Sequence, residues 1–502
     1  MDHRQHYRNA AMVVQMNTKR NKPGVKVVKS MRKSHAAIGL TWAMLLYLVC
    51  LSGTLAVFFE EFERWEQPTI PEYPDYTPDS IERATDMFLA QADTPPKTLY
   101  VVLPSTAMPR MHVSGDDTEF YLAADGTLTD PPAQGWTHFL LHLHNHLLLP
   151  ETAGLLITGS LGVILCGLIV TGLLAHPSLL KDLFRFRNQR SDRLRELDLH
   201  NRLGVWGAPF YLMMGMTGAF FGLVGVLIAA GAWLWTDNDR DALIAAVYGE
   251  DIQIVTSEKK IDYRSAFANL KTAAPDAQPI YLMLQNPGQD TQYLEIAATL
   301  PGRLIYSEIY RFHPDGQLLS HQGLSDGPIG RQVAYSVYRL HFGHFGGFMS
   351  KALYAIMGTA LTLLCVSGVN IWLARQKDWR LLHLLWPGFV WACPGALAMA
   401  AVAALLDFRP APVFLITLPL LTIATGFMAS AARVRQYGKF FLLGCLLSVF
   451  ATHIGLYAEY SWRPSAVGIN VGLLLLGLII YGGLLSSFSR SSKKLGPARP
   501  LS

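Results

Sequence analysis

The chain has 502 residues, of which 51% are hydrophobic and 16% are charged, and its formal net charge is +5. This balance favours a membrane protein over a soluble one. The small net charge argues against nucleic acid as a partner. All five cysteines lie in apolar runs, which argues against a disulfide framework or a thiolate metal site.

Residues 1–33 hold nine Lys or Arg and little hydrophobicity, and we interpret them as a disordered, basic cytoplasmic tail. They are not typical of a cleavable signal peptide, because the basic stretch is long and leads into a full-length apolar span. Roughly 20 apolar residues are needed to cross a bilayer. Eight segments are candidates by this measure: residues 36–58, 153–175, 204–232, 350–374, 384–406, 413–429, 440–457 and 467–486.

Basic residues between these segments predict their orientation, because Lys and Arg accumulate in cytoplasmic loops. With eight spans, every basic group falls on the side of the N-terminus. These groups are Lys181, Arg185, Arg187, Arg190, Arg193, Arg195 and Arg202 in and after the 177–198 loop, then Arg375, Lys377 and Arg380, then Arg433, Arg435 and Lys439, and finally the 487–502 tail. The pattern predicts a multi-pass protein of a bacterial inner membrane, in contact with lipid, with both termini in the cytoplasm.

Two long connections, residues 60–135 and 236–340, then lie on the outer side. The first holds fifteen Asp or Glu against four Lys or Arg, which suits the side away from the basic loops. The sequence pattern of each connection predicts that it forms a small periplasmic α+β module. The expected helices are 78–89 and 263–273, and the expected strands are 98–103, 111–114, 119–122, 280–285, 292–297 and 305–312, with Asp-Gly turns at 125–126 and 315–316.

The histidines at the ends of the spans repeat in register. His35 and His200 are each followed by a glycine after four residues and by another after eighteen. His144 precedes Thr171-Gly172, and His341 precedes Ser367-Gly368, with His-to-Gly distances of 28 and 27 residues. The chain therefore contains two parallel repeats, residues 34–176 and 199–376, related by an axis along the membrane normal.

Symmetry pairs His35 with His200 at the inner face and His144 with His341 at the outer face. Two facing imidazoles without carboxylate or thiolate neighbours suit a haem, whose iron needs only two axial ligands. We therefore expect two b-type haems. Glycine and Ser/Thr on the same helices would let a flat macrocycle or a neighbouring helix approach closely.

Other assignments of the histidines stay open. His176 also lies at the inner boundary and could replace His35 as a ligand, and His142, His146 and His344 are alternates at the outer boundary. The i,i+4 pairs His138/His142 and His142/His146 could bind zinc or copper instead. A single haem, or histidines with only a structural role, are further alternatives.

Four motifs in this order resemble the PepSY-associated transmembrane family. They are Ser34-His35 with Gly39, Leu143-His144-Asn-His-Leu-Leu-Leu, Asp198-Leu-His200 with Leu-Gly204-Val-Trp, and Leu340-His341-Phe-Gly343 with Gly347. The resemblance covers residues 30–376. It implies a mainly α membrane protein with about eight spans: a duplicated four-helix haem-binding core, two periplasmic PepSY-like α+β modules, and here a C-terminal four-helix extension at 384–486.

The resemblance also implies an oxidoreductase that reduces periplasmic ferric-siderophore complexes. His138, His142, His344 and Trp136 lie near the expected outlet and are candidate substrate contacts. No Gly-rich dinucleotide fingerprint follows a strand, so the electron donor would be a quinol or a separate cytoplasmic reductase. The extension has no paired histidines; packing, partner docking or a lipid or quinol contact are its expected roles. The rival functions are a siderophore or peptide permease and a non-enzymatic PepSY-type binding or regulatory protein.

Overall fold

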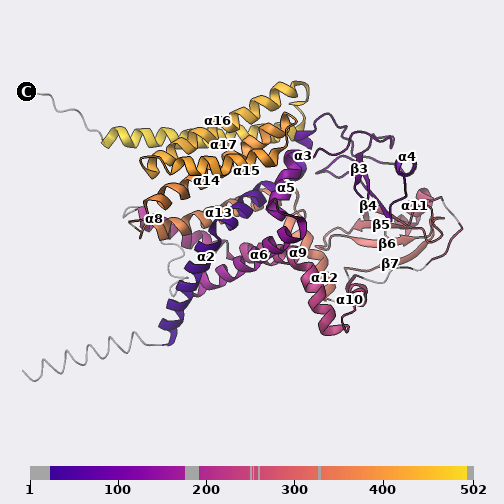
Figure 1. The fold of residues 1–502 in the computed structure, drawn as a ribbon. Helices are drawn as coiled ribbons and strands as arrows, with labels where there is room; N and C mark the ends of the chain where they lie inside the picture. The colour runs from indigo at the N-terminus through magenta and orange to yellow at the C-terminus, as the bar shows by residue number, and fades with distance from the viewer. Residues whose placement is uncertain are drawn as a thin grey trace, which may run out of the picture. The chain divides into compact units, whose positions relative to one another are not determined.

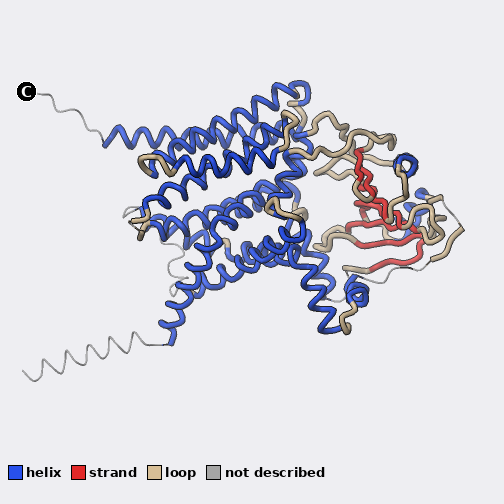
Figure 2. Tube along the Cα trace, in the orientation of Figure 1, coloured by secondary structure: helices blue, strands red, loops and turns tan. Residues whose placement is uncertain are grey.

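A computed structural model describes residues 23–175, 192–248, 252, 254–257, 260–325, 329–376 and 378–494. His176, most of the 177–198 loop with Lys181, Arg185, Arg187 and Arg190, and Lys377 lie outside these residues. Within them the chain is mainly helical with one β-sheet (Figure 1, Figure 2). It divides into two compact units: Met1–Thr54, His144–Leu223 and Leu353–Arg380 form the first, and Leu55–Leu143, Val224–Ala352 and Leu381–Ser502 form the second. Each unit is described by itself.

The first unit is built from four long apolar helices. They are α2 (Pro23–Ala56), α6 (Glu151–Leu174), α9 (Ala208–Trp235) and α13 (Gly347–Leu373), with α8 (Asp192–Trp206) leading into α9. Their shared core includes Leu46, Leu161, Leu168, Tyr211 and Leu361. All four long helices are long and apolar enough to cross a membrane. Helix α2 already begins at Pro23, so the last part of the expected 1–33 tail is helical.

Helices α6 and α9 approach each other through glycines. A Cβ atom on Gly159 would lie 2.8 Å from backbone atoms of Gly222, and one on Gly162 would lie 2.6 Å from the carbonyl oxygen of Gly215. Such contacts are possible only because these residues have no side chain. Close backbone approach increases the dispersion attraction between membrane helices, which lack a hydrophobic driving force for association.

The C-terminal extension consists of α14 (Arg380–Leu405), α15 (Pro410–Thr425), α16 (Ala431–Leu456) and α17 (Pro464–Lys494) (Figure 1). Among the described residues, seven helices meet the length and hydropathy of a membrane span, and α15 is not one of them. Its 16 residues are about 24 Å long. It nevertheless returns along α14, because Thr425 near its end donates a hydrogen bond of 3.2 Å to the carbonyl of Leu384 near the start of α14. Helix α17 extends to Lys494, past the expected end at 486.

The second unit also holds a seven-stranded antiparallel sheet in the order β3-β2-β1-β4-β5-β6-β7. The strands are β1 (Thr98–Val102), β2 (His112–Gly115), β3 (Thr118–Tyr121), β4 (Gln278–Gln285), β5 (Tyr293–Thr299), β6 (Glu308–Phe312) and β7 (Leu318–Gln322). Two separate modules were expected from the outer connections 60–135 and 236–340. In the structure the two connections form one sheet, because β1 of residues 60–135 pairs with β4 of residues 236–340.

Two helices cover one face of this sheet. They are α4 (Pro78–Gln91) and α11 (Tyr263–Ala273), close to the two expected helices. Ile81 and Phe88 of α4 and Leu270 of α11 share a buried core with Leu284 and Phe312 of the sheet. The sequence analysis did not predict β7 or four short helices: α3 (Phe59–Glu66), α5 (Trp136–His146), α10 (Arg240–Tyr248) and α12 (Ile329–Phe342).

Candidate functional site

His35 and His200 lie together in the first unit, although 165 positions separate them in the sequence. Their ring centroids are 6.2 Å apart and their planes are nearly perpendicular, at 81°. His35 belongs to α2, and His200 belongs to α8, directly before α9. The structure therefore brings together the two histidines that the sequence repeat pairs at the inner face.

His35 is held by the neighbouring helix α6. Its Nδ1 atom lies 3.0 Å from the carbonyl oxygen of Leu168 and 3.3 Å from Oγ1 of Thr171. A Cβ atom on Gly172 would lie 3.2 Å from Cε1 of the imidazole. The helix thus offers an acceptor for the ring, and the glycine leaves space for it.

His200 is held by α13 in the same way. Its Nδ1 atom lies 3.0 Å from Oγ of Ser367, and the backbone of Leu364 also bonds to the ring. A Cβ atom on Gly368 would lie 3.3 Å from Cε1. Burial is the main reason that the pKa of His200 falls to about 4, so this imidazole is neutral near pH 7.

His144 repeats the arrangement on α2. Its Nδ1 atom lies 3.1 Å from the carbonyl oxygen of Val49 and 3.4 Å from Oγ of Ser52. A Cβ atom on Gly53 would lie only 2.5 Å from Cε1 of the ring. Burial lowers the pKa of His144 as well.

The short helix that carries His144 has a buried acidic cap. Both carboxylate oxygens of Glu66 accept hydrogen bonds at the start of α5, from the backbone N–H of Trp136 and from the N–H and hydroxyl of Thr137. A carboxylate at this end of a helix satisfies free N–H groups and complements the helix dipole. Glu66 therefore positions the first turn of the helix whose last turn holds His144.

The three anchored histidines share one local pattern, which we call the imidazole notch. In each notch a backbone carbonyl lies four residues before a glycine, and a serine or threonine directly precedes that glycine. The members are Val49, Ser52 and Gly53; Leu168, Thr171 and Gly172; and Leu364, Ser367 and Gly368. The sequence analysis assigned these glycines to the approach of a macrocycle or a helix. The structure shows that they accommodate an imidazole.

The notch determines which ring nitrogen is available. A carbonyl oxygen can only accept, so Nδ1 of His35 and of His144 must carry the proton and donate it. The unprotonated nitrogen is then Nε2, and metal-binding histidines are usually oriented by such a bond from the other nitrogen. Val49, Leu168 and Leu364 could not be predicted from the sequence, because any residue type can offer its backbone carbonyl as the acceptor.

The inner pair fits two axial ligands of one iron. Metal–imidazole bonds are about 2.0–2.1 Å long, so two imidazoles on opposite sides of a metal have ring centroids about 6 Å apart. The observed 6.2 Å agrees with this separation. Among the residues that the structure describes, no group of three or more His, Cys, Asp or Glu could hold a metal ion. The two imidazoles would supply two ligands to a metal held between them.

The remaining candidates have varied surroundings. His341 lies at the end of α12 beside Phe342, in the second unit, whereas His144 is assigned to the first, so the outer pairing stays a prediction. His138 and His142 stack on α5 with centroids 6.2 Å apart. His344 lies among aromatic rings. His146 ends α5.

Trp136 is only 4% exposed, and its ring packs between Phe62 and Phe139. Trp136 is the first residue of α5. Its contact with a substrate stays a prediction.

Residues 32–375, well over half of the chain, match the family described as "PepSY-associated TM region". The chain belongs to the PepSY-associated TM family. A Pseudomonas aeruginosa protein named "Uncharacterized protein PA4219" is 31% identical over 293 residues, which are 54% of this chain and 72% of that protein. The family match includes α2, α6, α9 and α13 and all three imidazole notches. Helices α14–α17 lie beyond it.

Proposed function

We propose that this member of the PepSY-associated TM family is a di-haem oxidoreductase of the bacterial inner membrane. It would carry electrons outward to a periplasmic ferric-siderophore complex. The observation that supports this proposal best is the His35–His200 pair, in which both rings are anchored through Nδ1 and separated as two axial ligands would be. A haem held in this way supplies reversible one-electron transfer.

The protein's own residues would bind the two haems and control their surroundings. His35 and His200 would hold the inner haem, and the sequence repeat assigns His144 and His341 to the outer one. The imidazole notches keep the ring orientation and the tautomer constant. Because haem potential depends on hydrogen bonding and burial around the axial ligands, the notches would also tune that potential.

Reduction explains iron release. Siderophores hold Fe(III) through hard oxygen donors, and this preference weakens when the iron becomes Fe(II). One electron per iron is required, and a quinol or a cytoplasmic reductase would be oxidised to supply it. The seven long apolar helices support a multi-pass membrane protein, and the basic loops support cytoplasmic termini.

A visible absorption spectrum of the purified full-length protein tests the proposal. After expression with ample haem, we expect a Soret band and sharp α and β bands when dithionite is added. A colourless protein would instead support the siderophore or peptide permease, or the non-enzymatic PepSY-type regulator. Such a result would reject the oxidoreductase outright.

Turnover provides the second test. Haem reduced in membrane vesicles should be reoxidised by a ferric siderophore only where the complex reaches the periplasmic face, with Fe(II) appearing in a ferrozine trap. His144→Ala and His341→Ala should abolish this turnover and leave the inner haem reducible. Variants that reduce the complex at the wild-type rate would contradict the proposed route.

A further inference from the structure

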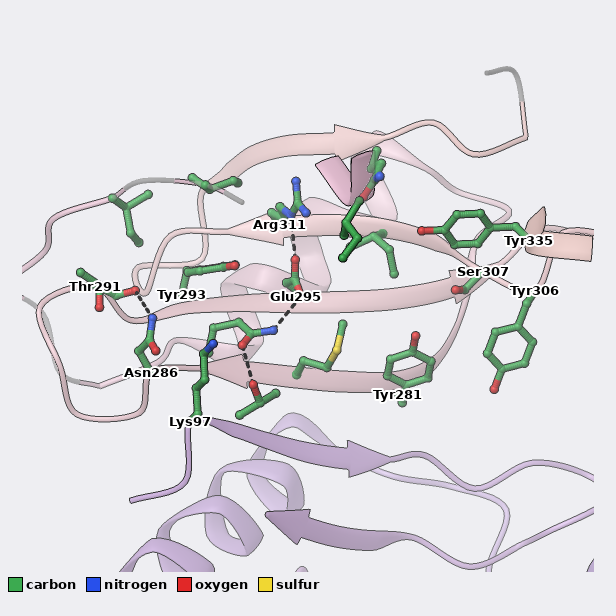
Figure 3. A pocket seen from close by; sticks show the side chains of 18 residues that line it. Lys97, Tyr281, Asn286, Thr291, Tyr293, Glu295, Tyr306, Ser307, Arg311 and Tyr335 are labelled. Carbon is green, nitrogen blue, oxygen red and sulfur yellow. Dashed lines mark hydrogen bonds and ion pairs between the residues drawn. The ribbon is translucent and has the colours of Figure 1, made fainter. Parts of the chain in front are cut away.

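The sheet has a second face, and this face carries a cavity of about 600 Å³. Successive side chains of a strand point to opposite faces. Leu282, Leu284 and Leu294 point into the core beneath α4 and α11. Their neighbours Tyr281, Met283 and Glu295 therefore point the other way, and they line the cavity (Figure 3).

The two ends of the cavity differ in chemistry. Tyr281, Tyr306 and Tyr335 surround one end, and Lys97 and Asn286 lie at the other (Figure 3). Aromatic rings offer large contact area with a polar edge, and they cost little conformational entropy on binding. A volume of this size falls in the range of small-molecule sites, which combine apolar walls with a few placed polar groups.

The charges on the cavity floor are largely neutralised inside the protein. Nε of Arg311 lies 2.7 Å from Oε1 of Glu295, and Nε2 of Gln285 donates to Oε2 of the same carboxylate at 3.0 Å. The third charged residue of the lining is Lys97. A ligand here would meet hydrogen-bond donors and one ammonium group, but no uncompensated carboxylate.

One donor at the cavity lacks a partner. Nε2 of Gln322, on β7, is buried and makes no hydrogen bond. A buried polar atom without a partner costs about 1–3 kcal/mol, and an acceptor oxygen supplied by a ligand would remove that cost. Because this atom is closed to solvent, a carbonyl-type oxygen of a ligand would reach it only after the Gln322 side chain turns into the cavity.

A series of contacting aromatic rings connects the cavity wall to the end of α12. Tyr306 contacts Tyr338 with centroids 4.3 Å apart, Tyr338 contacts Phe342 at 4.5 Å, and Phe342 contacts His341 at 5.5 Å. All of these residues belong to the second unit. A ligand at the tyrosine end would thus be linked by packed side chains to the histidine that the repeat assigns to the outer haem.

We propose that this cavity binds the organic shell of an uncharged, oxygen-rich iron chelate of the hydroxamate type. In such a chelate three singly charged hydroxamates balance Fe(III). Its carbonyl oxygens suit Lys97, and its methylene linkers suit the tyrosine end. The identity of the ligand rests on the proposed function, whereas the location of the site rests on the cavity alone.

The test measures binding without reduction. The probe is the gallium(III) complex of a linear trihydroxamate, because Ga(III) matches the charge of Fe(III) but is not reduced. Titration calorimetry on the purified full-length protein should give saturable binding. Tyr281→Ala and Lys97→Gln should each weaken it about tenfold, as expected for the loss of one contact to the ligand.

Lys271→Gln is the matched control, since Lys271 is an exposed lysine on α11, on the covered side of the sheet. It should bind the probe as the wild type does. Lys97 is also exposed, so its substitution leaves folding intact. No binding to the wild type, or equal binding to both lysine variants and Tyr281→Ala, would overturn the site.

Two further outcomes separate the proposals. Stronger binding of a trianionic gallium tricatecholate than of the trihydroxamate complex would overturn the assigned ligand class. A protein that lacks haem but binds the trihydroxamate complex in a Tyr281-dependent way would support the cavity and reject the oxidoreductase. A haem-containing protein that binds no probe would reject the cavity and leave the oxidoreductase standing.

Discussion

The ring planes of His35 and His200 are nearly perpendicular, at 81°, and their centroids are 6.2 Å apart. Each ring is anchored by a different helix, α6 for His35 and α13 for His200. If α6 or α13 shifted, its histidine would shift with it. The two imidazoles therefore lie together only when the four-helix core is assembled.

Removing either member of this pair should remove the same haem. We expect His35→Ala and His200→Ala each to lower haem content by one equivalent, measured as pyridine haemochrome per protein, and to leave the outer haem bound. His313→Ala, directly after β6, is the control and should retain both. If His176→Ala removes the inner haem and His35→Ala does not, the repeat has misassigned that ligand.

The imidazole notch predicts a sharp difference between two glycines. In Gly53→Ala the new Cβ would lie 2.5 Å from Cε1 of His144, which is too close for a real contact. The hydrogen bond from Nδ1 to the carbonyl of Val49 holds the ring at this place in the wild type. The ring must move, so we expect loss of the outer haem with the inner one retained. Gly167→Ala, on α6, has nothing within 4 Å of its Cβ and should retain both haems. Equal haem content in the two variants would contradict the notch.

Topology depends on whether the short helix α15 crosses the membrane. Its first residues pack near Phe139, since Phe414 lies 5.5 Å from that ring, and its last turn bonds to the start of α14. We therefore expect reporter fusions within 60–135 and 236–340, and at Phe408, to read periplasmic. Fusions at Met428 and at the C-terminus should read cytoplasmic. A periplasmic C-terminus would overturn the eight-helix topology.

The C-terminal extension has a measurable structural role. Asn470 of α17 accepts a hydrogen bond of 3.1 Å from Nε1 of Trp65 and donates one of 3.2 Å to Nδ1 of His453, whose ring stacks on Trp65 at 4.6 Å. Asn470→Ala leaves two buried ring nitrogens, Nε1 of Trp65 and Nδ1 of His453, without their bonds, at a cost of about 1–3 kcal/mol for each.

We expect Asn470→Ala to lower the thermal unfolding midpoint of the purified protein and to leave its haem spectrum unchanged. Thr272→Ala, an exposed change on α11, should leave both unchanged. An unaltered midpoint in Asn470→Ala would show that the network adds nothing to stability.

The sequence by itself determined the membrane class, the positions of the long helices and the close approach of His35 and His200, whereas the repeat stays a prediction. These properties depend on apolar length and on spacing along the chain, which do not require knowledge of distant partners. The helices α4 and α11 were equally visible, because their apolar faces and caps are local. The short helices α3, α5, α10 and α12 were missed, because each directly precedes or follows a long apolar helix and the sequence does not show where one helix ends and the other begins.

Only the tertiary structure decided how distant segments meet. The β1–β4 pairing joins residues near 100 with residues near 283, so two expected modules become one sheet. The acceptor of His35 lies 133 residues away on α6, and that of His144 lies 95 residues away on α2. Every residue type has a backbone carbonyl, so the sequence does not show which one accepts a hydrogen bond. The role of each glycine became clear only when the structure placed an imidazole against it. For this reason the histidines could be named from the sequence, whereas the notches that hold them could not.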